Sequence, residues 1–427
     1  MTRTTTTVAA LLTAAQLLGC GDSDNEAELL ARAQAIHGRV ITIDTHVDIN
    51  PANFTPERSY ATRLPTQVDL VKMEEGGLDA AFLIVYVGQQ QDFTPAGFAR
   101  AHETAIQKFD AIDRLVGELA PDRAELARTA ADVRRIHGAG KRVILVGVEN
   151  AYPIGEDLTN IERFFQRGAR YMSLAHNGHN HLSDSNTGER DGEWRHNGLS
   201  PLGRQAVAEL NRLGIMVDIS HPSKEANRQM MELSRAPVIA SHSAARALAN
   251  SSRNLDDDEL RMLQQNGGVV QTVAFNSYVR IPPPPSPERT QALGELRAEF
   301  GLPAQAGGGG GGGLQALSDE QRAAYQARMQ ELNERLPPPP RATVADFVDH
   351  IDHLVQLIGI DPVGISSDFD GGGGVEGWNN ASETLNVTVE LVRRGYSEEE
   401  ITKLWGGNLL RVMERVEEVA REIRAGR

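Results

Sequence analysis

The chain has 427 residues, a formal net charge of −15 and a single cysteine. This length can bury a large core, in one domain or several. No cluster of Lys and Arg is present, so we expect no nucleic-acid partner, because binding phosphates requires a basic surface. A single cysteine also excludes an internal disulfide.

The N-terminus contains a short apolar stretch, Val8–Gly19, that ends at Leu17-Leu18-Gly19-Cys20 and is followed by polar residues. The stretch is too short to span a bilayer as a permanent helix. It resembles a bacterial lipoprotein signal. This resemblance implies that residues 1–27 are a signal peptide and tether and that Cys20 carries the lipid. It also implies a lipid-anchored protein of the periplasm or cell envelope. An ordinary signal peptide, or a leader with an incidental cysteine, is the alternative.

The rest of the chain, 28–427, alternates short apolar runs with helical patterns, which predicts a single α/β domain built as a (β/α)₈ TIM-type barrel. Six of the runs end in His, Asp or Glu, as expected for a site on the C-terminal face of the strands. The expected strands are Val40–His46, Leu78–Val87, Arg142–Glu149, Ala169–His176, Ile215–His221, Val238–His242, Val269–Phe275 and Val363–Asp368.

Helix signals support this assignment. Residues 28–38 are expected to form a short helix before the first strand. Ser200 and Gly214 are expected to cap a helix over Leu202–Leu213, with Pro201 at its first position. Thr343–Gly359 is a second clear helix, and Ser397–Arg427 is expected to be a charged terminal helix.

An insertion at about 281–340 interrupts the pattern after the seventh strand. It begins with Pro282–Pro285, ends with Pro337–Pro340 and contains the glycine run Gly307–Gly313. Two charged helices, Pro287–Phe300 and Ser318–Leu336, are expected between these breakers. The segment is either a disordered surface loop or a lid over the site.

The strand-end residues are of the types that bind divalent metals. His46 and Asp48 are two residues apart, so in an extended backbone they share a face. Glu149 follows a very apolar run, where a buried carboxylate needs compensating cations. His221 and His242 end adjacent strands, and Asp368 ends the last one.

His176 ends the fourth strand, where it is either a ligand or a donor to a developing oxyanion. The loop behind it carries His179 and His181, which we interpret as solvated histidines rather than as a third metal cluster.

In this order the motifs resemble those of the membrane dipeptidase (renal dipeptidase) family of di-zinc peptidases, which have a metallo-dependent hydrolase-like barrel. The resemblance covers about residues 40–410. The matching stretches are His46-Val47-Asp48, Gly147-Val148-Glu149, Leu174-Ala175-His176, Gly198-Leu199-Ser200-Pro201, Leu210–Gly214, Asp218-Ile219-Ser220-His221, Ser241-His242-Ser243-Ala244, Arg253-Asn254, Ser367-Asp368-Phe369-Asp370-Gly371 and Gly406-Gly407-Asn408.

The resemblance implies two Zn²⁺ ions. His46 and Asp48 would hold one, His221 and His242 would hold the other, and Glu149 would bridge both, with Asp368 beside the first. It implies a dipeptide substrate, with Asp368 and His176 catalytic and with substrate contacts from His176, Arg253 and Tyr278. It also implies that a D-residue is accepted at the C-terminal position.

The chain departs from the family pattern on loops of the C-terminal face, which puts substrate choice in doubt more than the chemistry. The departures are Asn150-Ala151-Tyr152 after the bridging glutamate, the histidines of the following loop, and the Pro/Gly insertion.

Two other functions stay open from the residues alone. One is another barrel metallohydrolase, acting on cyclic amides, lactones or phosphoesters, although such enzymes often use an HxH motif and a carboxylated Lys. The other is a lipid-anchored binding protein without activity. The side-chain preference, the native metal and the oligomeric state, including a homodimer, also stay open.

Overall fold

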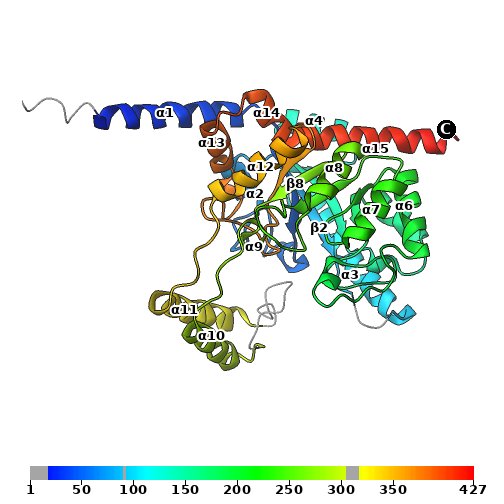
Figure 1. The fold of residues 1–427 in the computed structure, drawn as a ribbon, viewed down its shortest axis with the longest axis horizontal. Coiled ribbons are helices and arrows are strands. Elements are labelled where there is room, and N and C mark those ends of the chain that lie inside the picture. The colour runs from blue at the N-terminus through cyan, green and yellow to red at the C-terminus, as the bar shows by residue number, and fades with distance from the viewer. Residues whose placement is uncertain (1–17, 90–92, 304–316) are drawn as a thin grey trace, which may run out of the picture.

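Eight parallel strands form the centre of the fold within residues 18–89, 93–303 and 317–427, which this computed structural model describes (Figure 1). In their order of pairing they are β1 (Ile43–Asp48), β2 (Ala80–Tyr86), β4 (Arg142–Glu149), β5 (Ala169–Ser173), β6 (Met216–Asp218), β7 (Ile239–Ser243), β8 (Val269–Val273) and β9 (Val363–Ser366). The segment after the last strand pairs with the first strand and closes the barrel: Asp48 N donates to Phe369 O at 2.9 Å. The expected (β/α)₈ barrel is confirmed, with one strand in each expected run.

Side chains of β2 show how the barrel buries both faces of its strands. Phe82 and Ile84 belong to one buried cluster with Leu145 of β4, whereas Leu83 and Val85 belong to a second, larger cluster. Alternate residues of a strand point to opposite faces, so a parallel barrel strand reads as a continuous apolar run. This explains why strand β2 is detectable from sequence but lacks a period of two.

The surrounding helices mostly follow the expected caps. Ser200 Oγ accepts from Gly203 N and Gly214 closes the helix in the left-handed region, while Thr343 forms a capping box with Asp346. The helices are α1 (Leu18–His37), α2 (Leu70–Gly76), α3 (Pro95–Arg114), α4 (Ala130–Gly138), α5 (Thr159–Gln166), α6 (Pro201–Leu213), α7 (Lys224–Leu233), α8 (Asp257–Asn266), α9 (Asn276–Val279), α10 (Pro287–Glu299), α11 (Asp319–Arg335), α12 (Val344–Ile358), α13 (Leu385–Arg393), α14 (Glu398–Thr402) and α15 (Asn408–Arg424). Short 3₁₀ turns cover Pro51–Asn53, Tyr152–Ile154, Asn186–Glu189 and Ala381–Glu383.

The C-terminal segment differs from the single helix expected there. A π-helical turn, Lys403–Gly407, separates α14 from α15, and another, Leu115–Leu119, extends α3. Helix α15 crosses the end of the barrel where the strands begin: Arg411 Nη1 donates to Gly267 O, just before β8, at 2.9 Å. The sequence also gave no signal for the short strand β3 (Ala124–Leu126), which pairs with β4.

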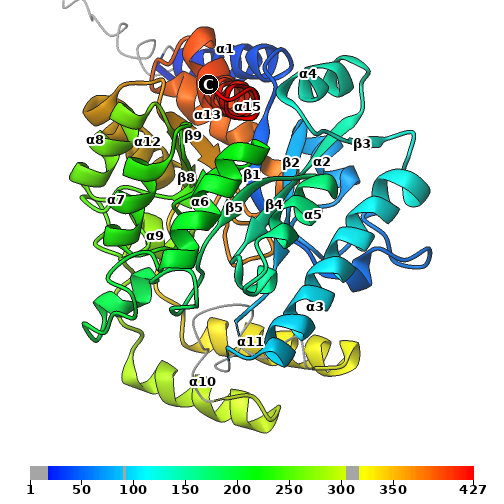
Figure 2. The ribbon, with the colours of Figure 1, turned by 90° about the vertical axis from the view of Figure 1, so that its right-hand side faces the viewer.

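Helices α10 and α11 of the insertion stand apart from the barrel on the side opposite α1 and α15 in both views (Figures 1 and 2). They have a small core of their own, formed by Leu296, Leu302, Leu317, Tyr325 and Leu332. The two expected helices are therefore confirmed and pack together. The glycine run lies outside the described residues.

Residues 1–17 of the expected signal peptide also lie outside the described residues. Among the helices that the structure describes, none combines the length and apolarity needed to cross a bilayer.

Candidate active site

The six expected metal ligands converge at the C-terminal ends of the strands. His46 and Asp48 come from β1, Glu149 ends β4 and His242 lies in β7. His221 follows β6 and Asp368 follows β9. All except Asp48 are at most 7% exposed. The alternation of the strands and the closure of the barrel bring these distant residues together.

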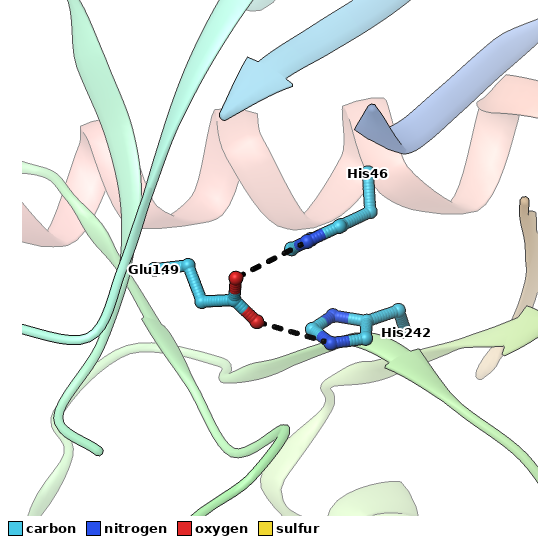
Figure 3. A group of neighbouring side chains, drawn as sticks. All are labelled: His46, Glu149 and His242. Atoms are coloured by element: carbon cyan, nitrogen blue, oxygen red, sulfur yellow. Dashed lines mark ion pairs between the residues drawn. The ribbon is translucent and has the colours of Figure 1, made fainter. Parts of the chain in front are cut away.

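Glu149 lies at the centre of this group (Figure 3). Its Oε2 is 3.6 Å from His46 Nε2. Its Oε1 is 2.9 Å from His221 Nε2 and 3.4 Å from His242 Nε2. The two carboxylate oxygens therefore face two different sets of donor atoms.

The first set of donors is completed by two further carboxylates. His46 Nε2 lies 3.7 Å from Asp48 Oδ2 and 3.9 Å from Asp368 Oδ1. The buried Nε2 has no hydrogen-bond partner among the described residues, so it is free to bind a ligand. Within each of the triads His46–Asp48–Asp368, His46–Glu149–His242 and Glu149–His176–His221, the donor atoms lie within 4.8 Å of one another. Imidazole and carboxylate donors so arranged fit divalent metals such as zinc.

Two hydroxyl groups orient the histidine ligands. Tyr171 Oη lies 2.8 Å from His46 Nδ1 and donates to Thr45 O at 3.0 Å. Ser241 Oγ lies 2.8 Å from His242 Nδ1 and donates to Asp218 Oδ2 at 2.6 Å. Each hydroxyl has one hydrogen, which it has already donated, so it must accept from the Nδ1–H of the histidine. In its neutral form, each of these histidines therefore carries its hydrogen on Nδ1 and presents the lone pair of Nε2 to the site.

Two buried aspartates connect the strand ends that carry the ligands through hydrogen bonds. Asp44 accepts from the backbone N of His46 at 3.2 Å and from Ser367 N at 3.0 Å, and it also accepts from the Ser367 hydroxyl. Asp218 makes the corresponding contacts with Ser220 N at 3.0 Å, Ser241 N at 2.9 Å and the Ser241 hydroxyl. The first aspartate joins β1 to β9 and the second joins β6 to β7, so each holds two ligand-bearing segments in register. Burial raises the pKa of both aspartates to about 6.

Burial and neighbouring charges shift the pKa values of the expected ligands in different directions. Burial lowers the pKa of His221 and of His242 well below the ordinary value, so both are neutral. Burial alone would raise the pKa of Glu149, but the neighbouring histidines outweigh it and hold that pKa well below its usual range. Burial would lower the pKa of His46, but Glu149, Asp368 and Asp48 outweigh it and raise the pKa to about 9. Binding a metal at His46 would therefore release a proton.

The backbone is strained at several of these positions. His221 has φ 82° and Asp368 has φ 58°, and Asn150 beside Glu149 has φ 68°. Non-glycine residues rarely adopt these angles, and such outliers cluster at functional sites. A Cβ at Gly371 would lie 2.3 Å from Asp368 Oδ1 and 2.4 Å from Asp48 Oδ2, so only glycine fits there.

The expected substrate residues lie around this centre. His176 Nε2 is 3.7 Å from Glu149 Oε1. Arg253, in the loop after β7, is 7% exposed and donates weakly to His242 O at 3.3 Å, but its buried Nε has no partner among the described residues. Its guanidinium carbon lies 5.3 Å from the ring centroid of Tyr278 on α9. A buried guanidinium with a free donor is suited to binding a carboxylate.

Sequence reasoning missed several residues of this region. Tyr171, Asp44 and Asp218 were not assigned a role, although Asp44 and Asp218 each stand two residues before a polar residue at a strand end, a signal that could have indicated them. His179 and His181 are partly buried rather than fully solvated, and among the described residues neither belongs to a group of candidate metal ligands. His179 Nδ1 accepts from Ser185 N at 3.0 Å, and His181 Nε2 lies 2.8 Å from Gly155 O, so both fasten the loop.

A parallel (β/α)₈ barrel with carboxylates and histidines converging at the C-terminal ends of its strands defines the class of barrel metallohydrolases. Within this class the chain belongs to the membrane dipeptidase family, peptidase family M19, whose model matches residues 30–427, and it is a metallo-dipeptidase.

Several proteins of known sequence or structure are similar to the chain. Dipeptidase tcpJ of Claviceps purpurea is 33% identical over 361 residues, which cover 84% of this chain and 71% of that protein. The crystal structure of the probable dipeptidase PvdM from Pseudomonas aeruginosa is 34% identical with a TM-score of 0.75, covering 92% of this chain and 99% of that one. A metallopeptidase from Rhodobacter sphaeroides, liganded with a phosphinate mimic of the dipeptide L-Ala-D-Ala, is 25% identical with a TM-score of 0.65, covering 88% and 99%.

Proposed function

We propose that this chain is a di-zinc dipeptidase that cleaves dipeptides with a free C-terminal carboxylate, including those with a C-terminal D-residue. The observation that carries the proposal is the position of Glu149. One of its carboxylate oxygens faces His46, while the other faces His221 and His242. A carboxylate shared in this way is suited to bridging two cations.

In this proposal His46, Asp48 and Asp368 hold one ion, and His221 and His242 hold the other. When bound, the ions supply Lewis-acid polarisation of the scissile carbonyl and a lowered pKa for water. The fit to zinc rests on the imidazole and carboxylate donors and on the His46 Nε2, which has no hydrogen-bond partner in the part of the chain that the structure describes.

The remaining residues bind and move protons. Arg253 pairs with the C-terminal carboxylate through its guanidinium, whose Nε has no partner among the described residues. His176 Nε2 donates a hydrogen bond to the carbonyl oxygen as negative charge develops there. The Asp368 carboxylate takes a proton from the attacking water and passes it to the leaving amine.

Acceptance of a D-residue follows from how the substrate is held. If Arg253 holds the dipeptide by its C-terminal carboxylate, substrate binding depends less on whether the C-terminal residue has the L or the D configuration. The relative from Rhodobacter sphaeroides that binds a mimic of L-Ala-D-Ala supports this part of the proposal.

The test combines metal analysis with a dipeptide panel. The purified protein should hold two zinc ions per chain and should cleave L,L- and L,D-dipeptides but not tripeptides. Glu149→Gln removes the shared charge, so its metal content and activity should both fall, the activity by several orders of magnitude. Full zinc occupancy with near-normal turnover in this variant would refute the bridging role.

We further propose that Cys20 is lipidated and anchors the enzyme in the bacterial cell envelope. The support is the apolar stretch that precedes this cysteine and the polar tether that follows it. Cys20 lies in the first turn of α1, far in sequence from every site residue. Cys20→Ser should therefore release an active enzyme from membranes. A variant that still sediments with membranes after a high-salt wash would refute the anchor.

A further inference from the structure

A buried lysine that the proposed chemistry does not use lies beside the active site. Lys108 of α3 is 9% exposed, and within the described residues its ammonium group forms no hydrogen bond or ion pair. Its Nζ lies 5.6 Å from the ring centroid of Tyr86, at the end of β2. A charged group so buried is costly unless a counter-charge compensates it.

The lysine lies over a ring that also contacts the expected substrate residue His176. The Tyr86 ring lies 4.5 Å, centroid to centroid, from the ring of His176. Burial lowers the pKa of Lys108, whereas the charges of Asp48 and Glu149 raise it. If two cations occupy the site, they neutralise these carboxylates, and the lysine then lacks a counter-charge.

The barrel order places Lys108 opposite Arg253. Helix α3 follows β2, whereas Arg253 follows β7, and these two strands lie across the barrel from each other in the pairing order. A dipeptide whose C-terminal carboxylate pairs with Arg253 and whose scissile carbonyl lies at Glu149 therefore directs its N-terminal residue toward Tyr86 and Lys108.

We propose that Lys108 is a specificity-determining residue that pairs with an acidic side chain on the N-terminal residue of the dipeptide. The inference rests on the proposed function and names its substrate class: dipeptides that begin with Glu or Asp. A charge-assisted contact with a desolvated ammonium favours the carboxylate over its amide isostere.

The experiment compares matched substrates with the zinc-loaded enzyme. We expect kcat/KM for Glu-Ala to exceed that for Gln-Ala by about tenfold, mainly through KM. Lys108→Met should reduce this ratio to about one through a larger loss of kcat/KM on Glu-Ala than on Gln-Ala, while Lys108→Arg should keep a preference for Glu-Ala. Ala-Glu and Ala-Gln serve as control substrates, because the acidic side chain of Ala-Glu is in the C-terminal residue. The ratio of their kcat/KM values should be the same in these variants as in the unmodified enzyme.

Lys141→Met is the matched control, because Lys141 lies just before the start of β4, at the other end of the barrel, and donates to Pro121 O at 2.8 Å. It should behave as the unmodified enzyme. If Lys108→Met lowered kcat/KM equally for Glu-Ala and Gln-Ala, the role of Lys108 would be merely structural and the inference would be overturned. Hydrolysis of dipeptides without a preference for acidic N-terminal residues would also overturn it and leave the proposed function intact. Failure to cleave any dipeptide would overturn both.

Discussion

Tyr171 holds His46 in the tautomer that a metal requires. Its hydroxyl donates to Thr45 O at 3.0 Å and accepts from His46 Nδ1 at 2.8 Å, so the lone pair of Nε2 points toward Glu149. A Cβ at Gly147 would lie 2.2 Å from the tyrosine ring, which shows that the barrel leaves space for this ring. Ser241 orients His242 in the same manner.

Removing either hydroxyl should weaken metal binding without unfolding the barrel. Tyr171→Phe and Ser241→Ala should each lower zinc affinity by about 10- to 100-fold, because the histidine loses the partner that fixes its tautomer. Competition with a zinc chelator measures this affinity. Tyr325→Phe in the insertion is the control and should bind zinc normally, whereas unchanged affinity in the first two variants would refute the orienting role.

The free donor of Arg253 predicts a dependence on the substrate carboxylate. Free dipeptides should be cleaved much faster than C-terminally amidated ones, because losing such a charge pair costs roughly 2–5 kcal/mol. Arg253→Ala should slow the free dipeptide and remove the difference between the two. Equal rates on both substrates with the unmodified enzyme would contradict the anchor.

The insertion should be removable, because its ends leave the barrel close together. Ala342 N, just after the insertion, donates to Asn276 Oδ1, just before it, at 2.7 Å, while α10 and α11 pack on a core of their own. Replacing Pro282–Pro340 with a short Gly/Ser link should shift the thermal unfolding midpoint by only a few degrees. Phe347→Ala in the barrel core should cost about 3–5 kcal/mol by comparison. If the deletion lowered the stability as much as Phe347→Ala does, the insertion would have to pack on the barrel.

His350 predicts part of the pH dependence of stability. Its Nδ1 accepts from Ala245 N at 3.1 Å and its Nε2 donates to Val279 O at 2.8 Å, which requires the neutral ring. Burial lowers its pKa in the folded state from 6.5, so below that pH the unfolded chain binds a proton that the folded chain does not. Stability should therefore fall as the pH decreases below 6.5, by at most about 1.4 kcal/mol per pH unit from this group.

Denaturant unfolding between pH 8 and 5 measures this contribution. His350→Gln should be less stable than the unmodified protein at pH 8 but should show a shallower loss on acidification. The other titrating groups are common to both proteins and cancel in the difference. If the free energy of unfolding changed with pH equally in both proteins, the contribution of His350 would be contradicted.

The sequence allowed the barrel and the convergent residues to be predicted because both depend on local patterns. Apolar runs such as Val143–Val148 end in a polar residue, and the C-terminal ends of parallel strands meet on one face of a barrel. The roles of Tyr171 and Asp218 depend on which strands are neighbours and in which register, and one sequence does not specify this. The burial of Lys108 depends on how α3 packs, which no local pattern reveals. The pairing of α10 with α11 was missed for the same reason, since both helices are highly charged.

The most direct test of the proposed site is anomalous diffraction from crystals of the zinc-loaded enzyme. Two zinc peaks should appear on either side of Glu149, one contacted by His46, Asp48 and Asp368 and the other by His221 and His242. A single peak, or peaks that Glu149 does not contact, would contradict the binuclear site.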